Sequence, residues 1–132
     1  MDWKLELVPV PVSDVERARR FYTEQAGFAA DVDHRADGEL RMVQLTPPGS
    51  ACSILVGRGF GDAAPGSVQG MQLTVSDIEA ARAELAGRGV DVSGVRHFAD
   101  GAWADGPGGP WNSFLFFSDP DGNGWTVQER PA

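Results

Sequence analysis

The spacing of apolar residues along the chain separates two helical stretches from a set of strands. Short runs of alternating or clustered apolar residues are typical of strands, whereas apolar residues three or four positions apart are typical of helices. A helix is predicted after each of two early strands, which are expected at 5–12 and 71–75. The later strands are expected at 28–34, 39–46 and 51–57, and again at 91–98, 112–118 and 124–130. The element order βαβββ therefore occurs twice.

An internal repeat supports this doubled order. The segments 12–19 and 75–82 are identical at six of eight positions, at an offset of 63 residues. Similarity at a fixed offset is the sequence signature of a repeated structural unit. The repeat therefore aligns the two halves residue by residue.

The repeated segment also carries signals for the two ends of a helix. Both copies match the S-x-x-E capping box, in which the serine caps the first turn. The pairs are Ser13 with Glu16 and Ser76 with Glu79. Gly27 is expected to end the first helix, and Gly87 or Gly89 the second.

Turn residues divide the chain between these elements. Ala36-Asp37-Gly38 predicts a hairpin turn, and 119–123 (D-P-D-G-N) a turn between the last two strands. The glycine-rich stretch 58–67 predicts a linker. The chain is thus expected to form a single α+β domain made of two tandem βαβββ modules, the first at 1–57 and the second at 68–132.

Composition narrows the possible partners. The formal net charge is −8, which disfavours nucleic acid and anionic membrane surfaces because both are bound through clustered lysine and arginine. The single cysteine, Cys52, allows no disulfide within the chain, and no secretion leader or membrane-spanning stretch is recognised. We therefore expect a cytoplasmic protein.

The doubled unit resembles the vicinal oxygen chelate superfamily. The resemblance rests on V-S-D at each helix start, Phe21-Tyr22 on the first helix and the late D-P-D-G-N turn, and it covers essentially the whole chain. The superfamily includes glyoxalase I, extradiol dioxygenases, fosfomycin-resistance enzymes and bleomycin-resistance binding proteins. It implies a glyoxalase-like pair of half-barrels that encloses a ligand cavity, and it makes a homodimer the expected assembly.

The resemblance also implies where metal ligands would lie, on the first and last strand of each module. The first-strand ligand lies seven residues before the helix-start aspartate, which gives Leu7 and Gly70, themselves 63 residues apart. The last-strand ligand lies seven residues after the start of the late turn, at Thr126, and 52–56 of the first module holds no carboxylate or imidazole. These side chains are not ligands for a divalent ion. We therefore expect no metal and no cofactor.

Two histidines are candidates for an atypical metal site. His34 and His97 lie in different modules, each near an aspartate, and without the close spacing of paired metal ligands. Ordinary surface or hydrogen-bonded histidines are the favoured interpretation. His97 is also kept as a candidate contact for a ligand.

Residues on the same face as the vacated ligand positions are candidates for a binding cavity. They are Leu7 on the first strand, Gln72 and Thr74 on the fifth, and Thr126 and Gln128 on the last. A cavity that is apolar at one end and carries amides and hydroxyls at the other suits an uncharged organic molecule. The alternative is that these residues pack a closed core.

The segment 99–111 is predicted to be a long loop rich in glycine and proline. It carries Trp103 and Trp111, which are candidates for stacking on a planar ligand, and Asp100 and Asp105, which would attract a positive group. The tryptophans have a second interpretation, in which they fold back and anchor the loop.

Three functions follow from these features. The first is a metal-independent small-molecule binder of the bleomycin-resistance type, taking an aromatic or cationic compound. The second is a metal-independent lyase, isomerase or cyclase in which His97, Gln72, Gln128 or Tyr22 transfers a proton. The third is a structural or regulatory dimer. Glyoxalase I and dioxygenase activities are disfavoured, because both need the missing ligands.

Overall fold

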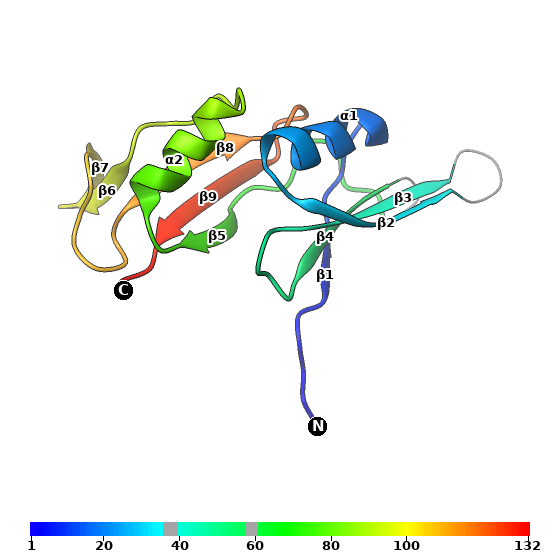
Figure 1. Cartoon of the computed structure of the whole chain (residues 1–132), viewed down its shortest axis with the longest axis horizontal. Helices are drawn as coiled ribbons and strands as arrows, with labels where there is room; N and C mark the ends of the chain where they lie inside the picture. Colours follow the sequence, from blue (N-terminus) through cyan, green and yellow to red (C-terminus); the bar gives the residue numbers. More distant parts are fainter. Residues whose placement is uncertain (36–39, 58–60) are drawn as a thin grey trace. The chain divides into compact units, whose positions relative to one another are not determined.

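The computed structural model describes residues 1–35, 40–57 and 61–132 (Figure 1). Its strands form two mixed sheets, and the chain divides into two compact units. Unit 1 comprises residues 1–68 with 119–123, and unit 2 comprises 69–118 with 124–132. The arrangement is the predicted α+β fold of paired βαβββ modules. No helix among the described residues is long and apolar enough to cross a bilayer.

Unit 1 contains a four-stranded sheet in the order β1-β4-β3-β2. The strands are β1 (Leu7–Pro9), β2 (Ala29–Arg35), β3 (Arg41–Thr46) and β4 (Ser53–Gly57). β1 pairs with β4 in parallel and the other pairs are antiparallel. Helix α1 (Val15–Arg20) continues into the π-helical turn η1 (Phe21–Gln25) and packs on β3 and β4. Apolar residues that alternate along β3 and β4 are buried against this helix, among them Val43, Leu45, Ile54 and Val56.

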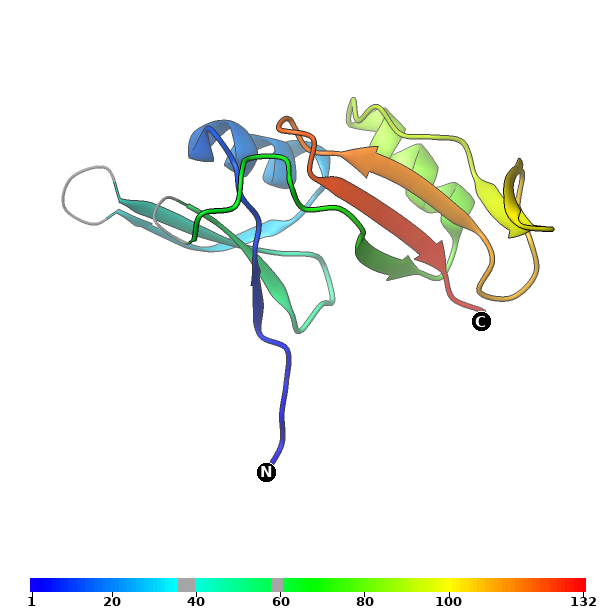
Figure 2. The same cartoon turned by 180° about the vertical axis from the view of Figure 1, so that it is seen from behind.

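Unit 2 contains a five-stranded sheet in the order β5-β9-β8-β6-β7. The strands are β5 (Met71–Val75), β6 (Arg96–Ala99), β7 (Ala102–Asp105), β8 (Phe114–Ser118) and β9 (Gly124–Glu129). Figure 2 shows the red strand β9 between the green β5 and the orange β8. Helix α2 (Ile78–Gly87) packs on β8 and β9. The face toward α2 is buried and apolar and includes Leu115, Phe117, Trp125 and Val127.

The helix starts differ from the predicted capping box by one residue. Asp14 and Asp77 are the N-caps, and each carboxylate accepts from the backbone N–H three residues on, at 3.0 Å. The hydroxyl of Ser13 instead donates to Asp121 at 2.6 Å, and Glu16 pairs with arginines. The prediction of serine caps was therefore wrong, because the aspartate next to each serine supplies the capping oxygen.

The helix ends follow the predicted glycine signals. Gly27 has φ of 81° after η1, and Gly89 has φ of 86° after α2. At the end of α2 the N–H of Gly89 bonds to the carbonyl of Ala86, and that of Val90 to the carbonyl of Leu85, both at 3.0 Å. This pair of bonds is a Schellman motif, which requires the left-handed conformation that glycine adopts without strain. Of the two alternatives for the second helix, Gly89 is the correct one.

Three predicted elements need correction. The first strand is limited to Leu7–Pro9, and the strand expected at 91–98 begins only at Arg96. The segment expected as a long loop contains β7, which pairs with β6 as a hairpin. Its turn residues Asp100 and Gly101 have φ of 53° and 79°, the two left-handed residues of a type I′ turn. The predicted turn at 36–38 and the start of the linker at 58–60 lie outside the described residues.

A buried carboxylate in unit 1 organises the D-P-D-G-N turn. Asp119 is 5% exposed, and its Oδ1 accepts from the backbone N–H groups of Asp121 and Asn123, both at 2.9 Å. Its Oδ2 accepts from the hydroxyl of Tyr22 and from the side-chain amide of Asn123, both at 2.8 Å. That amide also donates to the carbonyl of Pro11 at 2.8 Å. The turn is therefore fixed to η1 and to the segment after β1 by charge-assisted hydrogen bonds.

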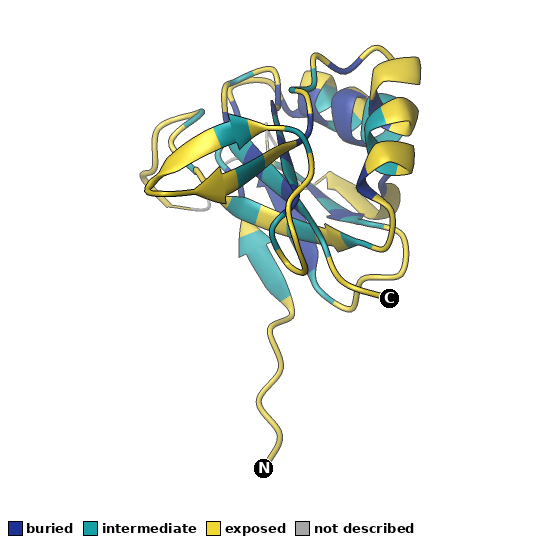
Figure 3. Ribbon diagram, turned by 90° about the vertical axis from the view of Figure 1, so that its left-hand side faces the viewer, coloured by how far each residue is buried: buried dark blue, intermediate teal, exposed yellow. Residues whose placement is uncertain are grey.

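The N-terminal segment is exposed. Residues 1–6 are exposed along their whole length, as the yellow N-terminal segment of Figure 3 shows. Trp3 is 89% exposed. The Trp3 side chain is therefore not part of the core.

Candidate functional site

The sheet of unit 2 has a second face, opposite the one that α2 covers. Residues paired across neighbouring strands share a face, so the register assigns its members. Gln72 lies opposite Thr126, which lies opposite Phe116. Thr74 lies opposite Gln128, which lies opposite Phe114. The structure therefore brings together, on what we call the open face, four residues predicted as a group: Gln72, Thr74, Thr126 and Gln128.

Aromatic rings extend the open face toward the β6–β7 hairpin. Trp103 contacts Phe98, Phe114 and Phe116, with ring centroids 5.2 to 5.4 Å apart and planes inclined by 75° to 83°. Such edge-to-face contacts are the favoured geometry for aromatic pairs. We call these four residues the aromatic cluster. Its indole is held by three rings and is still 47% exposed.

Of the two interpretations of Trp103, the structure shows the anchoring contacts, and stacking on a ligand stays a prediction. Its contacts with the phenyl rings anchor the hairpin to β8, as expected of an anchoring residue. The exposed half of the indole leaves a large aromatic surface on the open face. Aromatic side chains of this kind provide large contact area together with a preferred geometry.

A chain of amides borders the cluster. The Gln128 side chain donates to the backbone carbonyl of Trp111 at 2.8 Å, and the Gln72 side chain donates to Oε1 of Gln128 at 2.6 Å. Trp111 itself has φ of 62° and is exposed. The predicted contact Trp111 therefore joins the site through its backbone, while its indole lies at the surface.

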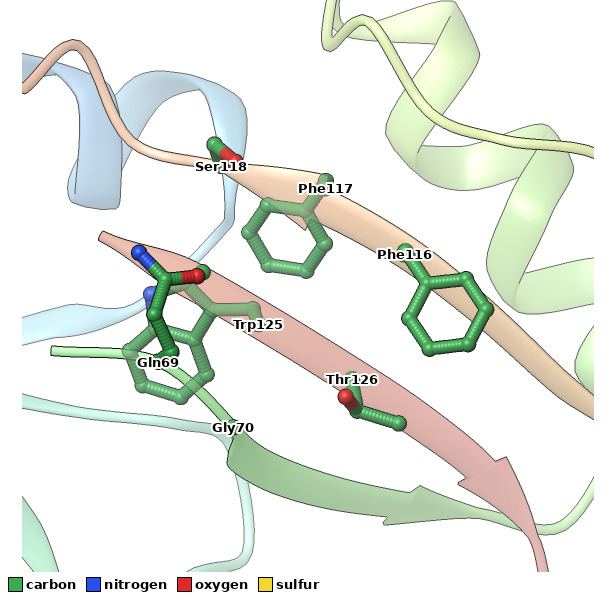
Figure 4. Close-up of a pocket in the computed structure, with 8 residues that line it drawn as sticks. Gln69, Gly70, Phe116, Phe117, Ser118, Trp125 and Thr126 are labelled. Carbon is green, nitrogen blue, oxygen red and sulfur yellow. The ribbon is translucent and has the colours of Figure 1, made fainter. Parts of the chain in front are cut away.

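A cavity of about 250 Å³ lies in unit 2 at the start of β9. Its lining includes Gln69, Gly70, Phe116, Trp125 and Thr126. Figure 4 shows Gln69 beside Trp125 at one end, and Phe116 and Thr126 on neighbouring strands at the other. Gly70, one of the vacated metal positions, contributes only backbone to this lining. The cavity thus adjoins the open face through Phe116 and Thr126.

Two predicted residues lie elsewhere. Because successive strand residues point to opposite faces, His97 lies on the other face of β6 from Phe98. Its Nδ1 is 2.9 Å from the carbonyl oxygen of Gly106. Leu7 belongs to unit 1, where it is half-buried on β1 opposite Ser53. His97 is thus not on the open face, and Leu7 belongs to the other unit.

Unit 1 has a polar row of its own, which the sequence analysis did not single out. Ser53 is buried, and its hydroxyl lies 2.6 Å from that of Thr46 and 3.3 Å from the amide of Gln44. Thr46 also donates to the carboxylate of Asp31. The alternation of polar and apolar residues along β3 was the available signal for this row.

The charged groups of unit 1 gather around Arg41. Its guanidinium contacts both carboxylate oxygens of Asp33 at 2.8 and 3.0 Å, and Glu16 on α1 at 2.9 Å. Hydrogen bonds from Arg19 and then Arg41 lower the pKa of Glu16 from 4.5 to about 2. The hydrogen bond from Arg41 also lowers the pKa of Asp33. These pairs connect α1 to the sheet and remain charged at neutral pH.

The positions of the superfamily's metal ligands do not fit a divalent ion in this chain. Leu7, Gly70 and Thr126 offer no carboxylate or imidazole, and β4 holds none along Ser53–Gly57. Among the described residues, no three histidine, cysteine, aspartate or glutamate side chains gather in one place. The metal-free site stays a prediction, and no step is derived through a metal.

Sequence reasoning missed most of the aromatic cluster. Phe98, Phe114 and Phe116 were not among the expected site residues. The run 114–117 is apolar on both faces, which indicates a strand whose second face is also apolar. The Asp100-Gly101 pair is a strong hairpin signal that would have placed Trp103 on a strand beside them.

The fold, the paired modules and the open face define the class of protein. The chain belongs to the Glyoxalase/Bleomycin resistance protein/Dioxygenase superfamily, whose model matches residues 4–127. It is similar to TnmS3, an antibiotic binding protein from Streptomyces sp. CB03234, with 35% identity, coverage of 98% of this chain and 97% of that one, and a TM-score of 0.78. A glyoxalase/bleomycin resistance protein from the same strain gives 36% identity, coverage of 95% and 99%, and a TM-score of 0.74. The uncharacterized protein YetH of Bacillus subtilis (strain 168) is 24% identical over 126 residues, which are 92% of this chain and 94% of YetH.

Proposed function

We propose that this protein binds an uncharged planar aromatic compound without a metal, and that the open face of unit 2 makes the main contacts. The observation that carries the proposal is the indole of Trp103, which is packed by three phenyl rings and remains about half exposed. An aromatic surface fixed before binding loses little conformational freedom when a ligand stacks on it. The cavity of about 250 Å³ beside Phe116 adds room for part of a ligand.

The similarity to TnmS3 supports an antibiotic as the compound. TnmS3 is an antibiotic binding protein and is 35% identical to this chain over nearly its whole length. In a superfamily that hosts several chemistries, function has to be argued from the site as well as the fold. Here the aromatic cluster supports a planar aromatic ligand, and the similarity supports an antibiotic.

The charges around the cluster favour an uncharged ligand over a cationic one. Asp105 lies directly opposite Arg96 in the β6–β7 pair, and Arg96 lies opposite Phe114. Because Asp105 and Arg96 carry opposite charges on neighbouring strands, the pair adds no net charge beside the cluster. Asp100 lies at the exposed tip of the hairpin, in the turn.

The geometry gives the enzymatic alternative less support. Tyr22 is 0% exposed and donates its hydroxyl hydrogen to Asp119, so it is not available to a substrate. Gln72 and Gln128 carry neutral amides, which are very weak acids and bases and so are poor general acid–base groups near neutral pH. Binding is therefore the function that the open face supports better.

We further propose that the protein is cytoplasmic and forms a homodimer through its exposed N-terminal segment. Trp3 and Leu5 are 89% and 71% exposed in the single chain, and large apolar side chains of this kind mark interaction surfaces. Sedimentation equilibrium tests the assembly, and a monomer at micromolar concentration would refute it.

The binding proposal is tested by titrating the protein with planar aromatic antibiotics and following tryptophan fluorescence and thermal shift. We expect saturable binding that Trp103→Ala weakens by about tenfold or more, since stacking and buried area are lost together. Trp3→Phe is the matched control, because it changes an exposed tryptophan outside unit 2. Equal affinities of Trp103→Ala and wild type would contradict the proposed site.

A further inference from the structure

We propose that the Gln72–Gln128 pair imposes a hydrogen-bond polarity on the aromatic cluster, so that the bound compound presents a donor, such as a hydroxyl or N–H, to Oε1 of Gln72. This inference rests on the proposed aromatic-binding function and names the ligand chemistry that the same face selects. It is carried by the direction of two hydrogen bonds and by their place beside the cluster.

The direction is fixed at one end by a backbone carbonyl. The carbonyl of Trp111 only accepts hydrogen bonds, so the Gln128 atom that lies 2.8 Å from it is Nε2. The other amide atom of Gln128 is therefore Oε1, which also only accepts. The Gln72 atom that lies 2.6 Å from Oε1 of Gln128 is then the donor Nε2. Oε1 of Gln72 is therefore the last acceptor in this series of hydrogen bonds.

The carbonyl that sets this direction is itself held in place. The side-chain amide of Asn112 bonds to both the N–H and the carbonyl of Phe98, at 2.9 Å each. The backbone of Asn112 bonds to Gly108 at 3.1 Å and to Gly109 at 3.0 Å. These hydrogen bonds hold the segment around Trp111 to β6 and to its own turn. The carbonyl of Trp111 therefore has a fixed position, and it orients the side-chain amides of Gln128 and Gln72.

The Gln72 amide, which ends this series of hydrogen bonds, lies beside the aromatic rings. Gln128 is the cross-strand neighbour of Phe114, and Gln72 is separated from Phe116 only by Thr126. Gln72 is exposed, and none of the residues that the structure describes donates to its Oε1. A ligand stacked on the cluster would cover this acceptor and remove its water.

The energetic consequence is a preference between ligands of the same shape. A ligand with a donor replaces the displaced water, whereas a ligand without one leaves the amide oxygen unpaired. Sites that pair a buried polar group discriminate against analogues that cannot pair it. Because Gln72 is exposed in the free protein, we expect a preference of roughly three- to tenfold.

The test uses two fluorescent probes of nearly equal shape, 1-hydroxypyrene and 1-methoxypyrene. Both offer the same planar surface, but only the first is a donor. Each is titrated at neutral pH into the wild type, into Gln72→Leu and into Glu79→Leu, a control at an exposed position of α2 that lies outside the open face and leaves the amide hydrogen bonds intact. The ratio of the two dissociation constants is measured for each protein, with circular dichroism to show that the variants are folded.

We expect 1-hydroxypyrene to bind roughly three- to tenfold more tightly than 1-methoxypyrene to the wild type and to Glu79→Leu, and we expect the ratio to fall near one in Gln72→Leu. Equal binding of both probes by the wild type, or an unchanged ratio in Gln72→Leu, would overturn the inference and leave aromatic binding standing. Failure of both probes to bind would refute the aromatic-binding function together with the inference. Loss of the preference in Glu79→Leu would also count against the assigned role of Gln72.

Discussion

Replacing Asp119 by asparagine tests how the late turn is held. The carboxylate accepts four hydrogen bonds, two on Oδ1 from the backbone N–H groups of Asp121 and Asn123 and two on Oδ2 from Tyr22 and the side-chain amide of Asn123. An asparagine keeps the shape but turns one oxygen into an NH₂ donor. In one orientation this donor faces two backbone N–H groups, and in the other it faces the amide of Asn123.

Neither orientation can be repaired by a small movement. The hydroxyl of Tyr22 can rotate to accept, but the amide of Asn123 already donates to Pro11 as well as to Asp119. At least one pair of buried donors therefore remains opposed. Loss of a hydrogen bond to a charged group and the cost of an unpaired buried donor together amount to about 2 to 4 kcal/mol. For a chain of this length, that corresponds to a fall in Tm of roughly 8 to 15 °C.

The assay is urea denaturation monitored by circular dichroism. The free energies of unfolding are compared for variants whose dependence on urea concentration, the m value, is the same as that of the wild type. Tyr22→Phe is the matched control, because it removes one donor and leaves the carboxylate with its three other bonds. We expect it to cost only about 1 kcal/mol. Asp119→Asn within about 0.5 kcal/mol of wild type, or equal to Tyr22→Phe, would refute the reasoning.

Two further predictions concern charge and backbone conformation. The pKa of Glu16 is lowered from 4.5 to about 2 by its arginine partners, so its contribution to stability is present above pH 4.5 and is lost as the pH falls toward about 2. In Glu16→Gln the acid-side decline in the free energy of unfolding should be shallower, and an unchanged pH profile would contradict this account. Gly66 and Gly49 both have positive φ, but only at Gly66 would a Cβ meet the carbonyl oxygen of Asp121, at 2.1 Å. Gly66→Ala should therefore lower Tm clearly more than Gly49→Ala, which costs about 1 kcal/mol from backbone strain alone, and equal losses would show that the close approach does not matter.

The errors of the sequence analysis have local physical causes. The serine caps were misplaced because serine and aspartate are adjacent and both are good N-caps, and only the contact of Ser13 with Asp121 decides between them. The hairpin of β6 and β7 was missed because the glycine and proline content of 99–111 outweighed its Asp-Gly turn signal.

The candidate site was predicted in part. The shared face of Gln72, Thr74, Thr126 and Gln128 followed from strand alternation once the strands were in register. The phase of β5 and β9 came from the superfamily resemblance, which implies ligand positions at Gly70 and Thr126, and the repeat supported only the match of Leu7 with Gly70. The partners of these residues in the aromatic cluster were not reachable in this way, since Trp103 meets Phe114 and Phe116 only through the pairing of β6 with both β7 and β8.

The sequence by itself determined the duplicated βαβββ order, the α+β class and the absence of ligand side chains at the superfamily's metal positions. These features depend on local periodicity and on residue identity, and both can be obtained from the amino-acid sequence alone. Only the tertiary structure decided that Trp103 is held by three phenyl rings and that the carbonyl of Trp111 directs the amides of Gln128 and Gln72. Such contacts join residues far apart in the chain, and their geometry depends on strand pairing and side-chain packing, which no local pattern specifies.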